Sequence, residues 1–473
     1  MPPTRHPRPP ALLLAASTLA IASAPAQMPP PQATHPDWKL LRQNEDWTKP
    51  PANDGDPLDA IKHVDLTDDG AFWVSFGGRV DERFEAWDGF GFGARTPGDR
   101  DSFFLTRVHL HADLHLGPHV RVWVEPRTAQ STDRDLPGQR RVVDVDTFDL
   151  YQAFVDLSAP VDGKPLRLRV GRQSFMLGAQ RVISPVPWNN VWNSWDGASA
   201  QWEIAGFRTQ ALFTWIVPNE PTSWNELDED RQLYGVYATK DATTETRGLD
   251  LYALGTTRPR VTVNGTSGDE RRHTFGARSF GALGGGFDVE LEAAWQLGRL
   301  GGSGTHGGFA AGVLGYRADA LWLAPRFFVG GDVATGDARP GGSVGTYFQS
   351  YPLGHAYLGY LDAIGRQNVV AAHLGSSWSL TAVTTLTVTG HVFRLFSGND
   401  DLYAVNGSST SPGIAPDGRD VGQEIYVLLT HRVSRHLDVF GGWSHFFTGS
   451  AVQGPGVTGS DIDFAYCGAS FVF

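Results

Sequence analysis

The stretch from residue 72 to residue 86 reads FWVSFGGRVDERFEA, and its side chains alternate between two kinds. Successive side chains of a β-strand point to opposite faces, so the pattern predicts a strand with one apolar face and one charged face. The apolar positions are Phe72, Val74, Phe76, Val80 and Phe84, and the opposite positions are Ser75, Arg79, Asp81, Arg83 and Glu85.

The same alternation returns in 102–116, 119–130 and 166–173, where aliphatic side chains again face away from charged ones. Strands of about ten residues suit the tilted span that crosses a bilayer, whereas strands of soluble proteins usually have about five or six. We therefore expect the apolar faces to meet lipid and the charged faces to line a lumen. The charged positions of these later segments are Arg107, His109, His111, Asp113, His115, Arg121, Glu125, Arg127, Arg167 and Arg169.

The whole pattern predicts an all-β fold, a transmembrane antiparallel β-barrel of about 18 strands within residues 71–473. Turns such as 116–118 and 318–320 are short, which is typical of the periplasmic side. Longer segments are expected outside the cell or folded into the pore; they are 131–146, 176–195, 218–230, 335–368 and 398–420.

The beginning of the sequence predicts export. Arg5 and Arg8 precede an apolar run, and Ala24-Pro25-Ala26 supplies the small residues of a cleavage site, so we expect a signal peptide at 1–26. Residues 27–70 are rich in Pro and Asp and predict a periplasmic N-terminal extension. At the other end, a last strand that finishes in Phe473 resembles the assembly signal of outer-membrane barrels.

Composition argues against several other classes of protein. The formal net charge of −12 disfavours nucleic-acid binding, and a single cysteine, Cys467, cannot form an internal disulfide. Motifs of common hydrolases, nucleotide-binding loops and zinc proteases are absent from the sequence, so we predict no enzyme, no cofactor and no metal site. A barrel without a transport role, such as an adhesin or receptor, and a barrel hydrolase stay open as alternatives.

Three sets of residues resemble the alginate export family of outer-membrane porins. They are the opening strand Gly77-Gly78-Arg79 with Arg83 and Glu85, in which the first Arg is displaced by a residue or two from the family pattern; Val170-Gly171-Arg172-Gln173 with Gly178, Gln180-Arg181 and Ser184-Pro185; and Tyr351-Pro352 with His355, Gly359, Asp362, Gly365 and Asn368. The N-terminal part adds Leu41-Arg42 with Glu45-Asp46-Trp47, and Asp56-Pro57 leading to Lys62. The resemblance runs from about Trp38 to Phe473. It implies an eighteen-stranded barrel, a lumen lined by arginines with acidic partners, and loops that gate the pore.

The predicted function is passive transport of an anionic saccharide, alginate-like, or of a similar polar solute across the bacterial outer membrane by a monomer. Arginine suits this task because its planar guanidinium binds a carboxylate through two hydrogen bonds and keeps its charge. Expected partners are the solute, outer-membrane lipid and periplasmic export proteins, but no nucleic acid. Alternatively, the same charges pair across strands and merely fill the lumen. The candidate pore residues are Arg79, Asp81, Arg83, Glu85, Arg107, Asp113, Arg121, Glu125, Arg127, Arg167 and Arg169, with 335–368 as a gating loop that contains His355, Asp362 and Asn368.

Overall fold

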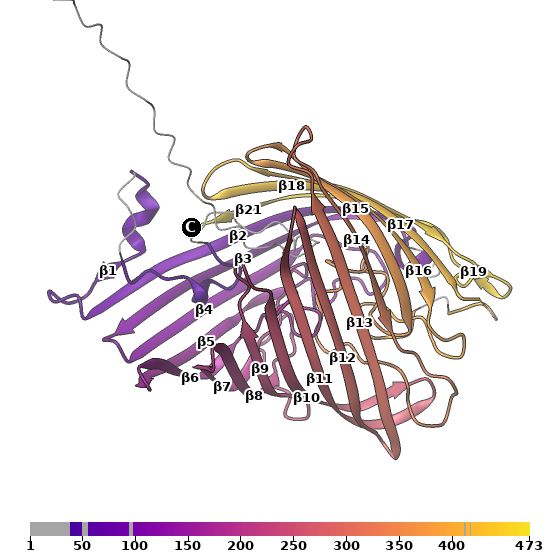
Figure 1. The fold of residues 1–473 in the computed structure, drawn as a ribbon, viewed down its shortest axis with the longest axis horizontal. Coiled ribbons are helices and arrows are strands. Elements are labelled where there is room, and N and C mark those ends of the chain that lie inside the picture. The colour runs from indigo at the N-terminus through magenta and orange to yellow at the C-terminus, as the bar shows by residue number, and fades with distance from the viewer. Residues whose placement is uncertain (1–37, 50–54, 94–97, 411–412, 417) are drawn as a thin grey trace, which may run out of the picture.

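A computed structural model describes residues 38–49, 55–93, 98–410, 413–416 and 418–473. Its strands follow one another around a closed antiparallel barrel, coloured from indigo to yellow in Figure 1. The barrel closes where β2 (Phe72–Asp88) pairs with β21 (Ile462–Val472). The predicted fold is thereby confirmed, with eighteen strands in the barrel.

Each strand pairs with its neighbours in sequence order. Between β2 and β21 the barrel strands are β3 (Asp101–Leu116), β4 (Val120–Ser131), β5 (Asp146–Val161), β6 (Lys164–Gln173), β7 (Trp195–Ile204), β8 (Phe207–Ile216), β9 (Gln232–Lys240), β10 (Gly248–Val263), β11 (Thr266–Gly284), β12 (Phe287–Leu300), β13 (Ser303–Arg317), β14 (Arg326–Ala334), β15 (Val369–Thr381), β16 (Thr384–Leu395), β17 (Asp420–Arg432) and β18 (Leu437–Thr448).

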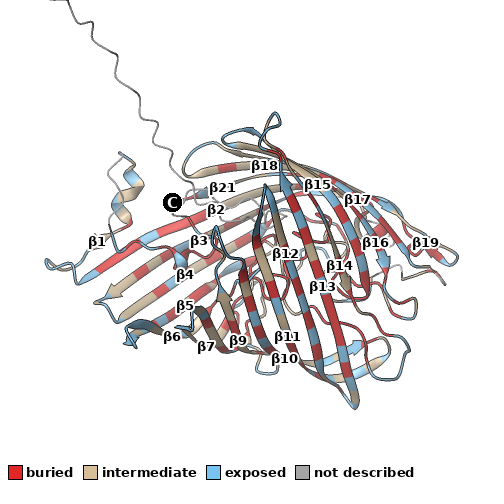
Figure 2. Cartoon of the chain, viewed as in Figure 1, coloured by how far each residue is buried: buried red, intermediate tan, exposed pale blue. Residues whose placement is uncertain are grey.

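Burial alternates along the strands, as Figure 2 shows for β11, β12 and β13. Arg107 and Glu125 are buried on the inner side of the wall, while Phe76, Phe104 and Leu110 are exposed on its outer side. Buried charges with exposed large apolar side chains invert the arrangement of a water-soluble protein. They are what a wall with lipid outside and polar groups inside requires.

The two ends of the barrel differ. One end, the turn end, carries short connections such as 117–119, 162–163 and 205–206, and the last strand finishes there beside Arg79. The other end, the loop end, carries the long segments 132–145, 174–194, 217–231, 335–368 and 396–419. One expected connection was wrong: β14 begins at Arg326 instead of residue 321, so the turn after β13 covers 318–325.

The described part of the N-terminal extension lies at the turn end (Figure 1). It contains the short 3-10 helices η1 (Arg42–Asn44) and η2 (Pro57–Ile61) and then β1 (Val64–Asp65), which pairs with β2. The predicted signal peptide at 1–26 lies outside the described residues. Within the described ranges, no helix is long and apolar enough to span a bilayer.

Cys467 gives a direct test of which face meets lipid, because it is exposed on the outer side of β21 beside Ala465 and Phe471. We expect a spin label on Cys467, in bilayers, to collide more with oxygen than with a water-soluble nickel complex. A label at Thr244→Cys in a Cys467→Ser background, on the exposed turn after β9, should show the opposite preference. Equal access of nickel to both sites would contradict the assigned face.

Candidate pore lumen

Most predicted arginines lie on the inner wall and bind acids there. Asp81 accepts from Arg79 at 2.8 Å and from Arg107 at 2.6 Å, so one carboxylate joins β2 and β3. The other pairs of the set are Arg83 with Glu85 (2.8 Å), Arg121 with Asp113 (2.6 Å), Arg127 with Asp146 (2.7 Å) and Arg169 with Asp156 (2.7 Å). Glu125 accepts from Gln152 at 2.8 Å and from the Trp123 indole at 3.1 Å, and it lies 3.0 Å from His109.

Three of these arginines also hold the segment 174–194, which is therefore folded against the inner wall. Arg83, Arg107 and Arg127 donate to the backbone carbonyls of Trp188 (2.8 Å), Asn189 (2.7 Å) and Trp192 (2.6 Å). The guanidinium of Arg83 also lies 3.9 Å above the Trp188 ring. Hydrogen bonds from a charged donor are about twice as strong as neutral ones, so these contacts fix the loop firmly.

The second long segment, 335–368, joins the first one inside the barrel. Tyr351 N–H donates to Val182 O at 3.0 Å, and Leu353 N–H donates to Gln180 O at 2.9 Å. Buried side chains of both segments pack in one apolar cluster with Tyr237, Phe309 and other inward residues of the wall. The two loops therefore form a single body across the lumen.

Glu424 of β17 attaches this body to the wall at a further point, three strands from β2 on the side of the closing seam. Its carboxylate accepts from the backbone N–H of Tyr360 at 2.7 Å and of Leu361 at 3.3 Å. A Cβ on Gly359 would lie 2.0 Å from the Glu424 carboxylate, and Gly359 has a φ of +92°. Glycine is required here both for the backbone conformation and for the close approach.

The three residues predicted for the gating loop occupy different parts of it. His355 stacks on Trp188 with 3.9 Å between ring centroids, and it lies 3.3 Å from Asp362. Asn368 instead lies at the base of the loop, where its amide donates to the carbonyls of Ser397 and Asp401 at 3.0 Å each. His355 thus joins the two loops, whereas Asn368 ties the segment to 396–419.

At the turn end the N-terminal segment reaches into the lumen. Arg121 donates to the Gln43 carbonyl at 3.0 Å, and Gln152 donates to the Gln43 side chain at 2.9 Å. Arg42 donates to the carbonyls of Gly78 (2.7 Å) and Phe473 (2.9 Å). The segment is therefore held to both strands that close the barrel.

Between this segment and the inner loops lies a vestibule of about 1040 Å³. Its lining includes Trp47, Arg121, Asp156, Arg167 and Leu177. Arg169 donates two hydrogen bonds to the carboxylate of Asp156, at 2.7 and 2.9 Å. Arg167 stays 3.9 Å from that carboxylate and its side chain is 40% exposed, so its guanidinium keeps free donors toward the vestibule.

A family model described as Alginate export matches residues 72–463. The chain belongs to the alginate export family. The comparison with curated proteins gives no match.

Similar solved structures are porins of two Pseudomonas species. OpdK of Pseudomonas aeruginosa with vanillate is 11% identical, with 84% of this chain and 98% of that chain covered and a TM-score of 0.55. The BenF-like porin of Pseudomonas fluorescens Pf-5 is 10% identical, covering 85% and 98%, with a TM-score of 0.57. OccK2 (OpdF) of Pseudomonas aeruginosa in complex with glucuronate is 11% identical, covering 87% and 98%, with a TM-score of 0.55. These likenesses show the fold, and fold and family together place the chain in the bacterial outer membrane.

A second set of inward charges, on β10 to β14 and in the loops, was missed in the sequence. Arg181 of the first loop binds Glu290 at 2.5 Å and Glu292 at 3.1 Å, and Arg366 of the second binds Asp332 at 2.6 Å. The alternation in 272–298 could have indicated these charges. Glu290 and Glu292 flank the outward-facing Leu291 in sequence, so their side chains point to the opposite, inner face. No spacing in the sequence indicated that loop arginines bind these acids. Among the described residues, no group of three or more His, Cys, Asp or Glu side chains could hold a metal ion.

Gly359→Ala tests the attachment of the loops to Glu424. The added methyl group should displace the backbone at Tyr360 and weaken the two hydrogen bonds that Tyr360 and Leu361 donate to the buried Glu424 side chain, each worth about 0.5–1.5 kcal/mol. We expect the ratio of closed to open channel to fall roughly 30-fold for a loss of about 2 kcal/mol, as measured by single-channel recording. Gly341→Ala is the matched control, because Gly341 lies in the same loop at a φ of +79° and a Cβ added there would have no neighbour within 4 Å. Equal currents from the two variants would contradict the attachment.

Lys62 gives the N-terminal segment a pH dependence. Its ammonium donates to Phe76 O at 2.9 Å and lies 5.1 and 5.3 Å from the Trp38 and Trp47 ring centroids. Burial lowers the pKa of Lys62 to about 7; nearby Arg42 also lowers it and Glu45 opposes the shift. The undocked lysine keeps its proton up to about pH 10.4, so docking should strengthen as the pH rises from about 7 to 10.

Protection of residues 38–49 and 55–63 from protease measures this docking. At each pH, the protection of the wild type is divided by the protection of Lys62→Met. This ratio removes the pH dependence of the protease itself. We expect that ratio to rise between pH 7 and pH 10, and parallel behaviour of the two proteins would contradict the buried amine.

Proposed function

We propose that this protein is a gated, passive channel for an anionic saccharide, with polyuronates such as alginate as the substrate class. The observation that carries the proposal is Arg167, an exposed cation in the vestibule whose nearest acid is already bound by Arg169. A free guanidinium can bind a uronate carboxylate through two hydrogen bonds and release it again, as conduction requires.

The neighbouring rings suit a sugar. Trp47, Trp73 and Trp202 lie in the same lining as Arg167. Aromatic side chains offer flat apolar surfaces with a polar edge, which match the faces of a pyranose ring. The solved porins with vanillate and glucuronate bind carboxylates on a similar fold, which supports an anionic solute here.

Four of the other predicted arginines take a different role in the proposal. Arg79, Arg83, Arg107 and Arg127 are committed to wall acids or loop carbonyls, so they position the loops and set the field around the path. The joined loops 174–194 and 335–368 act as the gate. The channel works without covalent chemistry and as a monomer embedded in outer-membrane lipid, and periplasmic export proteins would meet it at the turn end.

Single-channel recording of the refolded protein tests the proposal. An oligouronate added on the turn side should block the current. Arg167→Gln should weaken that block about tenfold and shift the reversal potential in a salt gradient away from anion preference.

Arg317→Gln serves as the control, because Arg317 is exposed near the turn end, binds Asp319 at 2.8 Å and lies outside the vestibule. It should leave the block unchanged. A conducting channel that prefers cations and ignores the oligouronate would contradict the proposed substrate class.

A further inference from the structure

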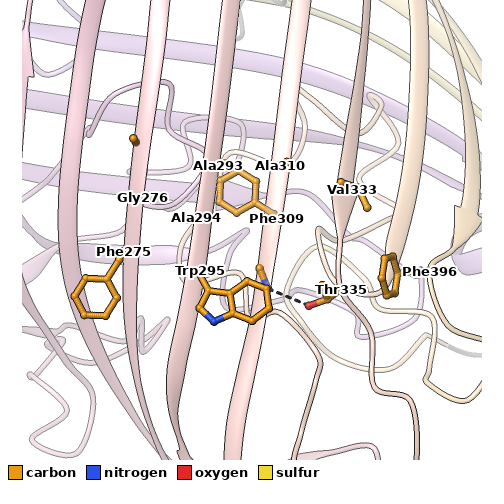
Figure 3. Close-up of a pocket in the computed structure, with 12 residues that line it drawn as sticks. Phe275, Gly276, Ala293, Ala294, Trp295, Phe309, Ala310, Val333, Thr335 and Phe396 are labelled. Atoms are coloured by element: carbon orange, nitrogen blue, oxygen red, sulfur yellow. Dashed lines mark hydrogen bonds between the residues drawn. The ribbon is translucent and has the colours of Figure 1, made fainter.

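The outer face of β11 to β14 carries an apolar groove near the loop end, with a volume of about 690 Å³ (Figure 3). Ala293, Gly308 and Ala310 form its floor. The rings of Phe275 and Trp295 stand on one side and the ring of Phe396 on the other, as Figure 3 shows. All three rings are exposed on the lipid-facing surface.

Strand register explains why the wall is hollow here. Trp295 lies opposite Phe275 on one neighbouring strand and opposite Gly308 on the other. A Cβ on Gly308 would lie 2.5 Å from the Trp295 ring, so only glycine lets the indole lie flat on β13. The next row pairs Ala293 with Ala310, and these small side chains leave the floor of the groove low between the rings.

Two arginines lie above the groove on the same face. Arg271 and Arg299 are four residues nearer the loop end than Phe275 and Trp295, about 13 Å along the strands. They face each other directly across β11 and β12. Like charges in that position repel each other, and an anion between them would remove the penalty.

Neither arginine has an acidic partner in the described part of the chain. The neighbouring carboxylate of Asp269 accepts from the Arg260 backbone N–H at 3.0 Å. His306, whose ring centroid lies 6.5 Å from that of Trp295, is a further exposed polar group between the arginines and the groove. The face therefore combines an apolar groove with an unneutralised cationic pair at its outer end.

We propose that this face binds an acylated, phosphorylated glycolipid of the outer leaflet. Its acyl chains lie in the groove between Trp295 and Phe396, and its phosphate lies between Arg271 and Arg299. The loop end of this fold faces the cell exterior, so the cationic pair stands at the level of outer-leaflet headgroups. A second copy of the chain fits less well, because a two-fold contact through this face would bring the arginines of both copies together.

Native mass spectrometry of the detergent-purified full chain tests the site, with lipid A and phosphatidylglycerol as the two probes. We expect lipid A to bind with clear preference and to be released by raised salt. Arg271→Gln/Arg299→Gln should weaken lipid A binding at least about tenfold. Ala310→Leu should weaken it independently, by filling the groove with a side chain that lipid tolerates.

Two controls match these changes elsewhere on the barrel. Arg208→Gln/Arg317→Gln removes the same charge from exposed arginines at the turn end, and Ala469→Leu adds the same bulk on the outer side of β21. Both should bind lipid A like the wild type, and the shift in electrophoretic mobility on heating shows that each variant is folded.

Three results would overturn the proposal. They are equal binding of phosphatidylglycerol, unchanged lipid A binding by both groove and arginine variants, and a dimer that is lost on Ala310→Leu. The first would assign the face to lipid in general, and the last would assign it to a second copy of the chain.

Discussion

The structure depends on the need to pair every backbone N–H and C=O group inside a membrane. Hydrocarbon offers no water to these groups, and each unpaired one costs several kcal/mol, so a sheet that spans the bilayer has to close on itself. Here the closing contact is the pairing of β2 with β21, in which Arg79 lies opposite Val472 and Asp88 opposite Asp463. Arg42 reinforces that seam from the N-terminal segment by binding carbonyls of both strands.

Closure determines where the charges lie. Where a strand crosses the hydrocarbon, it has to turn its charged face inward, and the lumen then holds arginines and carboxylates at close range. A buried charge without a partner costs about 3–5 kcal/mol, so the inner wall is built from pairs such as Arg169 with Asp156. Arginines lie between acids that would otherwise repel one another. Several of these arginines keep N–H groups that do not bind an acid. These donors hold the loops: Arg107 binds both Asp81 and the carbonyl of Asn189.

The sequence was sufficient for the barrel because alternation is a local property of each strand. Residues 72–86 alone show which side chains face lipid, and the same rule located the other strands, although β11 and β13 begin six residues before the positions expected from the alternation. It misplaced the start of β14, because Leu321 and Trp322 are apolar but lie in an exposed turn. The candidate site was predictable only in part. Alternation puts Arg167 and Arg169 on one face, but it does not reveal that Arg169 makes the hydrogen bonds to Asp156 while Arg167 stays 3.9 Å from that carboxylate. Loop contacts such as Arg181 with Glu290 join residues more than a hundred positions apart, and no local pattern encodes them.

We propose that segments 174–194 and 335–368 form one gate inside a conducting barrel, in which 174–194 stays on the wall through Arg83, Arg107 and Arg127 and opening separates 335–368 from it. A disulfide between the two segments tests this gate. Ile183→Cys and Tyr351→Cys, in a Cys467→Ser background, place the two thiols on residues that already pair with each other in an isolated parallel β-bridge. We predict that the oxidised channel stays in a low-conductance state and that reduction in the bilayer restores gating and raises the mean current. Equal currents before and after reduction, with the disulfide verified by mass, would contradict a gate formed by these two segments.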